Sequence, residues 1–310
     1  MVTLRKMQTQ YSFFDPAIAA RLTAIPLVSR TSMIGGVSGR HKSPHRGSSV
    51  EFAEYRKYVP GDDLRRLDWR AYGRTDRFYV KEFEADTNLR CILVMDSSGS
   101  MGFGSVGMSK WEYARRLAST LAYLAIQQGD AAGLVCASNA ITHRLPPRRN
   151  PAHLAAWMEM VSQVAPSGET HLPRLLHELA ETVSQRAMVI VFSDFFAEPS
   201  LWRDCFEHLR FRKHDVSVFH LLDPEELQFE FQRPTRFTDL EGNASVFVEP
   251  SEIQDRYHIA LKEFLASFQQ TCLETRTEYR RVSIDTSVES TLKEFLVARL
   301  AGTGRQGSRK

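Results

Sequence analysis

The stretch VMDSSGSM, residues 94–101, ends an apolar run in three side chains that carry oxygen. Asp96, Ser98 and Ser100 are spaced two residues apart and are followed by glycine-rich sequence. The preceding CILVM, residues 91–95, is the near-continuous apolar run that is typical of a strand buried on both faces of a parallel sheet. We therefore expect a core strand that ends at Asp96 in a polar loop.

After this stretch, the chain alternates expected strands with expected helices. A second apolar run, AMVIVFSD, ends in Asp194. Such alternation predicts an α/β fold with a doubly wound, mostly parallel sheet and helices on both faces. Strands are expected at 89–95, 132–138, 141–145, 187–194, 216–222 and 279–284, with 141–145 at an edge, and helices at 110–128, 152–163, 171–185, 201–212, 251–272 and 288–300.

A change in residue types and hydrophobic periodicity divides the chain into an N-terminal module, 1–88, and a sheet domain, 89–300. The module is predicted to begin with a short amphipathic helix within 14–30, introduced by an aspartate and a proline. The rest of it is rich in Gly, Arg, His and Asp, with short aromatic pieces, which predicts a smaller, irregular, β-rich segment. Residues 226–248 predict strands inserted into the sheet domain, and 301–310 predict a disordered tail.

Composition limits the classes of function. The 310 residues are 43% hydrophobic and 25% charged, as in soluble globular proteins. With 40 basic and 37 acidic residues the net charge is +3, too small to indicate a nucleic-acid or membrane-surface partner. No run approaches the roughly 20 apolar residues of a membrane span, so we expect no span and a cytoplasmic location. The four cysteines are isolated and suit buried positions.

The polar side chains at the strand ends predict a metal site. Ligands of doubly wound sheets bind beyond the carboxyl ends of the strands, where Asp96, Ser98, Ser100 and Asp194 should meet Thr170 from the loop before a helix. Two carboxylates and three hydroxyls, without histidine or thiolate, are the hard donors that Mg²⁺, or Mn²⁺ and Ca²⁺, prefer. Mg²⁺ commonly keeps waters, so a position stays open for a carboxylate from another protein. An ordinary capped loop is the alternative interpretation of the triplet.

The same five residues resemble the metal-ion-dependent adhesion site of the von Willebrand factor A domain, over about 89–300. This resemblance implies a Rossmann-like doubly wound fold. It also implies that the ion bridges to an acidic residue of a partner protein.

A second resemblance begins before the metal triplet. The segment GRHKSPHRGSSVEFAEYRKYVPGDDLRRLDWRAYGRTDRFYVKEFEAD is similar to the signature of a bacterial family, domain of unknown function 58, whose members join it to a von Willebrand A-like domain. This resemblance implies a MoxR-type AAA+ ATPase as partner, in chaperone-like, maturation or metal-insertion tasks. The matching residues are Gly39, His41, Ser43, Gly47, Glu51, Phe52, Arg56, Tyr58, Gly61, Asp62, Asp63, Arg65, Asp68, Trp69, Arg74 and Lys81.

Two interpretations of this signature stay open. Its arginines and aspartates can form ion pairs that fix the module, or they can bind a partner; the interleaved aromatics also suit a nucleic-acid surface, which we do not expect. The ion-pair interpretation concerns Arg56, Asp62, Asp63, Arg65, Asp68 and Arg74.

The expected function is that of a non-enzymatic, metal-dependent, protein-binding adaptor. Its partner would be a MoxR-type AAA+ ATPase or the client of that ATPase. The alternative is a metal-dependent hydrolase that uses His41, His45 and the aspartates of the signature. The sequence contains neither a glycine-rich phosphate loop followed by Lys-Ser/Thr nor a Gly-x-Ser-x-Gly elbow. We therefore expect no ATP hydrolysis by this chain.

Overall fold

A computed structural model describes residues 11–30, 51–57, 79–84, 89–242 and 244–306. The chain forms two compact units, one of residues 1–31 with 90–310 and one of residues 32–89. Each unit is described by itself.

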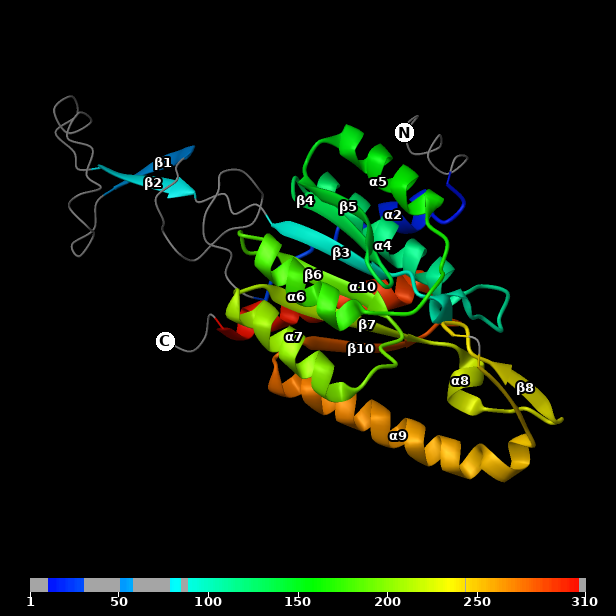
Figure 1. Ribbon diagram of the computed structural model, residues 1–310. Helices are drawn as coiled ribbons and strands as arrows, with labels where there is room; N and C mark the ends of the chain where they lie inside the picture. Colours follow the sequence, from blue (N-terminus) through cyan, green and yellow to red (C-terminus); the bar gives the residue numbers. More distant parts are fainter. Residues whose placement is uncertain (1–10, 31–50, 58–78, 85–88, 243, 307–310) are drawn as a thin grey trace. The chain divides into compact units, whose positions relative to one another are not determined.

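The larger unit is built on a six-stranded sheet of order β10-β7-β6-β3-β4-β5 (Figure 1). Neighbouring strands are parallel except β5, which pairs antiparallel with β4 at an edge. This confirms the predicted doubly wound α/β sheet and its edge strand. The strands are β3 Arg90–Asp96, β4 Ala131–Ala137, β5 Ile141–Arg148, β6 Met188–Ser193, β7 Asp215–Leu222 and β10 Glu278–Ser283.

Helices cover both faces of this sheet (Figure 1). Side chains of α6, α7 and α9 pack in one apolar cluster with alternate residues of the central strands, such as Ile92 and Val94 of β3. On the other face α4 packs on β3 and β4, and α2, α5 and α10 contact α4. The helices are α2 Pro16–Leu22, α4 Lys110–Gln127, α5 Pro151–Gln163, α6 Leu172–Thr182, α7 Pro199–Phe211, α9 Pro250–Glu274 and α10 Val288–Gln306.

The central strands are buried because both faces are covered. Residues 91–96 of β3 and all of β6 are buried, which is the burial that their continuous apolar sequences predict. Within the apolar cluster, Phe195 packs edge-on against Trp202, with ring centroids 4.9 Å apart, and at 4.9 Å from Phe268 of α9. The ends of β3 and β6 are therefore held by a rigid, close-packed core.

The expected boundary of the N-terminal module is wrong for its first helix. The helix predicted within 14–30 is present as α2, with Asp15 as its N-cap, but it ends at Leu22. It belongs to the sheet unit because Phe14 is buried with its ring 5.6 Å from that of Tyr123 on α4. Arg21 also pairs with Glu289 of α10. The helix α2, which was predicted as part of the module over 1–88, therefore belongs to the sheet domain.

The predicted insertion at 226–248 is a hairpin of β8 Thr235–Thr238 and β9 Ser245–Val248, paired antiparallel. It follows a short helix that was not predicted, α8 Pro224–Gln228. Asp223 caps α8 in a reciprocal capping box with Glu226, and a proline occupies the first turn. The sequence Asp-Pro-Glu-Glu, residues 223–226, contains this helix-capping pattern.

Residues 301–306 of the predicted disordered tail are helical. Helix α10 continues to Gln306 rather than ending near residue 300, because extending a formed helix adds one hydrogen bond for each residue fixed and needs no new nucleus. Residues 307–310 lie outside the described part of the chain. Among the described helices, none has the length and apolar character that crossing a bilayer requires.

In the smaller unit, the described strands are β1 Glu51–Lys57 and β2 Tyr79–Glu84. They pair antiparallel, with a register shift between Phe52 and Glu54. The pair agrees with the β-rich character predicted for this segment.

Candidate metal centre

The predicted site lies where the winding of the sheet changes direction. From β3 the chain passes to β4 on one side, whereas β6 lies on the other side of β3. Met95 pairs with Phe192 in the parallel register, so Asp96 at the end of β3 and Asp194 just beyond β6 reach the same edge. Ligands of open α/β sheets bind at this kind of crevice.

Asp96 is fully buried and is held by three neighbours. Its Oδ1 accepts a hydrogen bond from the backbone N–H of Ser98 at 3.0 Å. Its Oδ2 accepts from the hydroxyl of Ser193 at 2.6 Å and from that of Thr170 at 3.4 Å. The carboxylate therefore joins two of the predicted hydroxyl-bearing loops.

The remaining hydroxyls lie in a short 3₁₀ helix, η2 Gly99–Gly102, and just before it. The Oγ atoms of Ser98 and Ser100 are 3.2 Å apart. Two backbone hydrogen bonds bind this loop to the loop that carries Thr170: Gly99 N–H donates to Gly168 O at 2.8 Å, and Ser167 N–H donates to Ser97 O at 2.9 Å. The two loops are thus fixed to each other by main-chain contacts.

Asp194 is buried and paired with Lys110, a residue that the sequence did not single out. The Lys110 ammonium donates to Asp194 Oδ2 at 2.8 Å and to Glu226 Oε1 at 2.6 Å, and the lysine side chain is 1% exposed. Burial lowers the pKa of Lys110, but the two carboxylates outweigh this effect and raise it above its ordinary value. Lys110 is therefore a buried cation at the rim of the site.

The surroundings of the Asp96 carboxyl group disfavour its charged form. Burial raises the pKa of Asp96 to about 7, with a further contribution from the nearby charge of Asp194, and the hydrogen bonds from Ser193 and Ser98 only partly offset this. No salt bridge to Asp96 is found within the described residues. A buried carboxylate without a cation is costly, and a bound divalent ion would remove this cost.

The donor set fits a hard divalent ion. Asp96, Ser98, Ser100 and Thr170 present carboxylate and hydroxyl oxygens around one point, and Asp194 contributes charge beside them. Among the described residues, no group of three His, Cys, Asp or Glu side chains that could hold a metal ion is found, so an ion here would depend on hydroxyl oxygens and water as well as on carboxylates. Mg²⁺ or Mn²⁺ therefore suits the residues present. Their role as ligands stays a prediction.

Other residues of the site were not predicted. Ser193 could have been found because it adjoins Asp194 at the strand end. Lys110 follows the N-cap Ser109, which closes a capping box with Glu112, but nothing in that pattern indicates that its ammonium points into the site. The local pattern at Glu226 indicates its capping box with Asp223 but not its contact with Lys110.

Glu241 was also missed: it accepts a hydrogen bond from the backbone N–H of Thr170 at 3.0 Å across 71 positions of sequence. No local pattern indicates such a long-range contact.

The signature of the N-terminal module contributes no described side chain to the site. Glu51 and Arg56 lie in β1, of which the structure describes the backbone. The interpretations of the signature, as ion pairs, as a partner surface or as a hydrolase centre, stay predictions. The candidate ion-pair, partner-binding and hydrolase residues that lie outside the described part of the chain are His41, Ser43, His45, Asp62, Asp63, Arg65, Asp68, Trp69 and Arg74.

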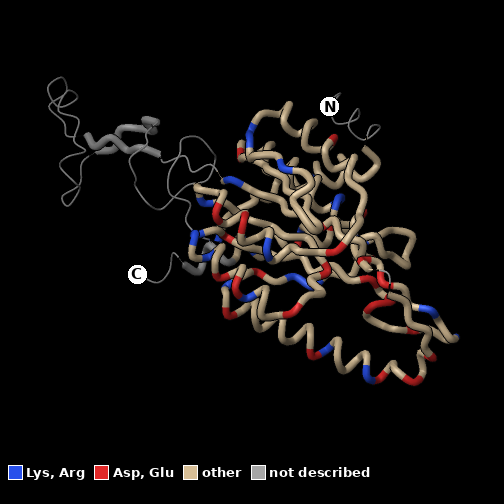
Figure 2. The backbone as a smooth tube through the Cα atoms, viewed as in Figure 1, with Lys and Arg blue, Asp and Glu red and all other residues tan. Residues whose placement is uncertain are grey.

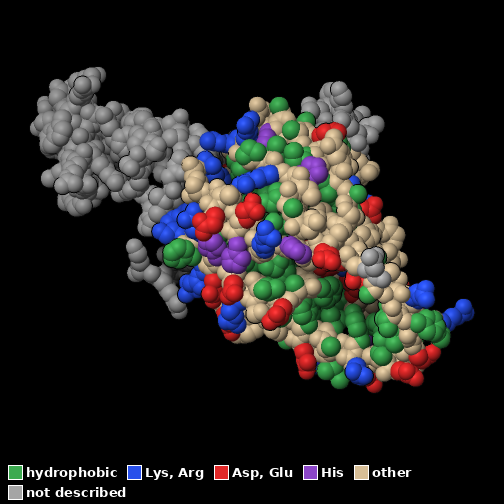
Figure 3. Space-filling view, viewed as in Figure 1, with side chains coloured by type: hydrophobic (Ala, Val, Ile, Leu, Met, Phe, Trp, Pro, Cys, Tyr) green, Lys and Arg blue, Asp and Glu red, His purple; other side chains and the backbone are tan. Residues whose placement is uncertain are grey.

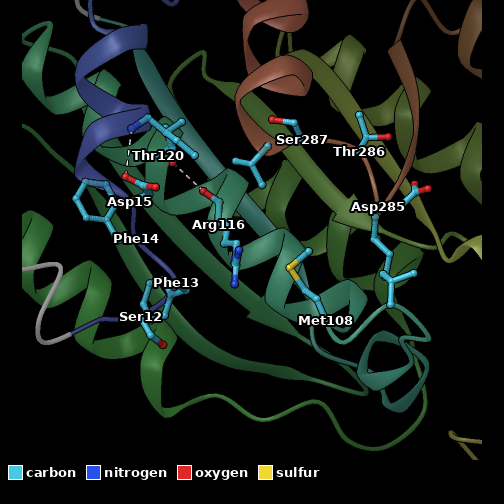
Figure 4. A pocket seen from close by; sticks show the side chains of 14 residues that line it. Ser12, Phe13, Phe14, Asp15, Met108, Arg116, Thr120, Asp285, Thr286 and Ser287 are labelled. Atoms are coloured by element: carbon cyan, nitrogen blue, oxygen red, sulfur yellow. Dashed lines mark hydrogen bonds between the residues drawn. The ribbon is translucent and has the colours of Figure 1, made fainter.

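A separate pocket of about 550 Å³ lies beside α2 and the start of α10 (Figure 4). Ser12, Asp15, Arg116, Asp285 and Ser287 contribute polar groups to its lining. None of the five predicted metal-site residues lines it.

A family signature matches residues 54–264, more than half of the chain, and its description is "Protein of unknown function DUF58". The chain belongs to the DUF58 family. Uncharacterized protein Rv1480 of Mycobacterium tuberculosis is 30% identical over 217 residues, covering 69% of this chain and 68% of that protein. Uncharacterized protein YeaD of Bacillus subtilis is 38% identical over 71 residues, covering 23% of this chain and 18% of that protein.

Solved structures with some likeness to this DUF58 protein include BatB from Bacteroides thetaiotaomicron. Its TM-score is 0.49 at 17% identity, and the match covers 70% of this chain and 100% of that one. The SpRpn10 VWA domain has a TM-score of 0.40 at 10% identity, over 66% of this chain and 93% of that one. The von Willebrand A-like fold of the sheet domain is evident from its own strand order, with the Asp-x-Ser-x-Ser loop at the switch point.

Lys110→Met should destabilise this DUF58 protein when divalent ions are removed by a chelator. The substitution leaves Asp194 and Glu226 without their cation, and breaking a buried pair typically costs about 3–5 kcal/mol. Because Glu226 is 18% exposed and can be hydrated, we expect a loss of about 3 kcal/mol in the free energy of unfolding, measured by urea denaturation. Lys262→Met, at an exposed position of α9, is the matched control. A loss no larger than that of the control would show that the ion pair does not stabilise the rim.

Proposed function

We propose that this chain is a non-enzymatic adaptor that binds an acidic side chain of a protein partner through a divalent ion. Asp96, Ser98, Ser100, Thr170 and Asp194 would hold the ion, directly or through water. The observation that carries the proposal is the contact of Thr170 with the buried Asp96 carboxylate, which brings oxygen donors from separate loops to one point. A bound ion supplies an electrophilic position that takes an incoming carboxylate.

The architecture around the ion suits binding without catalysis. The donors sit on loops that main-chain hydrogen bonds and the core hold in place. A rigid site of this kind presents the ion at little cost in conformational entropy when the partner binds. Basic and acidic residues are interspersed along the described chain (Figure 2), so the ion is the local feature that would select an acidic group.

The partner we propose is a MoxR-type AAA+ ATPase or its client. This part rests on the resemblance to family members that are commonly encoded beside such ATPases. The chain would then connect the ATPase to the protein that it remodels or matures. A location in the cytoplasm accords with this role and is part of the proposal.

Pull-down from the native cell tests this function, with wild type, Asp96→Ala and Thr170→Ala in parallel. Partners held through the ion should be captured by wild type in Mg²⁺ and lost in both variants and in chelator. The folds should persist, because Asp96 is the last residue of β3 and Thr170 lies in a loop, so that neither substitution removes an apolar side chain of the core. Circular dichroism would check this. An ATPase captured equally by all three proteins and in chelator would contradict the metal bridge.

A further inference from the structure

The turn between β8 and β9, of which residues 239–242 and 244 are described, lies against the candidate metal centre. The backbone of Leu240 lies directly over Gly99 in the Asp-x-Ser-x-Ser loop, so that a Cβ at Gly99 would overlap the Leu240 carbonyl. The next residue, Glu241, directs its carboxylate to the backbone N–H of Thr170 at 3.0 Å. The turn thus contacts two of the loops that form the site. In Figure 1, α8 and β8 lie beyond the same end of the sheet as the tip of β3.

Hydrogen bonds within the turn orient Glu241. Asp239 N–H donates to Ala244 O at 2.8 Å and closes the turn. The Asp239 Oδ1 accepts from the N–H of Glu241 at 2.9 Å, which is the local side-chain bond by which aspartate shapes turns. Glu241 is half-buried, whereas Gly242 beside it is exposed. The turn is therefore built to place this one carboxylate against the site.

Aromatic side chains anchor the base of the hairpin, whereas the apolar side chains at its tip are exposed. Phe237 of β8 stacks on Phe229 at 5.5 Å, and Phe229 stacks on Tyr257 of α9 at 4.4 Å. At the tip and on β9, by contrast, the apolar side chains of Leu240, Val246 and Phe247 are 49%, 58% and 67% exposed. Figure 3 shows hydrophobic side chains gathered over this end of the molecule. Few buried contacts would be lost if the tip moved away from the site.

We propose that Glu241 is an internal acidic ligand of the metal centre and occupies the place that a partner's carboxylate takes. This inference rests on the proposed function, because it assigns a regulation to the same ion. Glu241 stabilises the bound ion, directly or through water, and keeps its open position closed until a partner displaces the β8–β9 turn. Lys110 pairs with Asp194 and leaves the charges of Asp96 and Glu241 for the ion to balance.

Mn²⁺ titration followed by electron paramagnetic resonance of the free ion tests this assignment. The full chain is used as wild type, Asp96→Asn, Glu241→Gln and Glu230→Gln. The glutamine at 241 retains an oxygen that can accept from Thr170 N–H but removes the charge. Glu230 is exposed on the same connection, so its variant is the matched control. Loss of a group that supports the metal ligands typically weakens metal binding about 10–100-fold. We therefore expect Glu241→Gln to bind Mn²⁺ at least about tenfold more weakly than wild type. Glu230→Gln should bind Mn²⁺ as tightly as wild type.

Hydrogen exchange of the turn supplies an independent readout. In wild type, Mg²⁺ should slow exchange of the amides in residues 238–245, because the ion ties Glu241 to the centre. In Glu241→Gln the same addition should leave their exchange unchanged.

Gly99→Ala should also abolish the slowing by Mg²⁺, since the added methyl group displaces Leu240 while all five proposed metal ligands remain. This second variant reaches the turn without altering the charge of Glu241.

The outcomes separate this inference from the function on which it rests. If wild type binds Mn²⁺ and Asp96→Asn does not, the metal centre stands. Equal Mn²⁺ affinity and equal turn protection in wild type and Glu241→Gln would then overturn the internal ligand alone. Failure of wild type to bind Mn²⁺ any better than Asp96→Asn would overturn both.

Discussion

With divalent ions chelated at pH 7, Asp96→Asn should unfold at the same temperature as wild type or higher, and addition of Mg²⁺ should stabilise wild type alone. Without an ion, wild type holds a fully buried carboxylate whose pKa is raised to about 7 by burial and by Asp194. Asparagine removes that charge and keeps an oxygen that can accept from Ser98 N–H. Addition of Mg²⁺ should therefore make wild type more stable than Asp96→Asn.

The size of the Mg²⁺ effect follows from linkage. An ion that binds only the folded state adds about 2.7 kcal/mol at 100 times its Kd. Scanning calorimetry with a Mg²⁺ series should show this rise for wild type and for Asp204→Asn, a control at an exposed position of α7. Equal Mg²⁺ shifts for wild type and Asp96→Asn would place any bound ion elsewhere.

Arg299→Met should cause the largest loss of stability. The Arg299 side chain is 0% exposed and pairs with Asp215 and, at 2.6 Å, with Glu278. It also donates to Val28 O at 2.7 Å and to Ser217 Oγ at 2.7 Å. Removing this guanidinium leaves the buried Asp215 carboxylate without its cation, whereas Glu278 on the neighbouring strand keeps its pair with Arg280 at 3.1 Å.

The expected loss lies at the upper end of the about 3–5 kcal/mol that breaking a buried pair costs, and it should lower the melting temperature by roughly 10 °C or more. Arg299→Lys should recover only part of it, because lysine lacks the planar fork of donors. Lys293→Met, at an exposed position of the same helix, should change little. Melting of Arg299→Met within about 2 °C of this control would contradict the structural role of the cluster.

Much of the fold could be predicted because it is encoded locally. The apolar runs before Asp96 and Asp194 identify two buried strands, and parallel strands bring their carboxyl ends to one edge. Thr170 lies in the loop between α5 and α6 rather than at the end of a strand, so its contact with Asp96 does not follow from that rule. The end of α2 at Leu22 and the extension of α10 to Gln306 were missed because helix ends depend on capping and tertiary packing that hydrophobic periodicity does not show.

The rest of the site depends on long-range packing. Lys110 meets Asp194 across 84 positions and Glu226 across 116, so no window of sequence contains the trio. Glu241 reaches Thr170 only because Phe237 anchors the hairpin beside α8 and α9. The sequence predicted inserted strands here, but a strand pattern cannot say over which loop a turn will fold.

The central claim is that a divalent ion bridges this chain to an acidic group of its partner. Titration calorimetry of the full chain against the MoxR-type ATPase from the same organism, in Mg²⁺ and again in chelator, tests it most directly. The account predicts binding in Mg²⁺, loss of binding in chelator, and recovery by Mg²⁺ or Mn²⁺ for wild type but not for Asp96→Ala. Equal affinity in Mg²⁺ and in chelator would contradict it and would leave the ion as a stabiliser of the loops around Asp96.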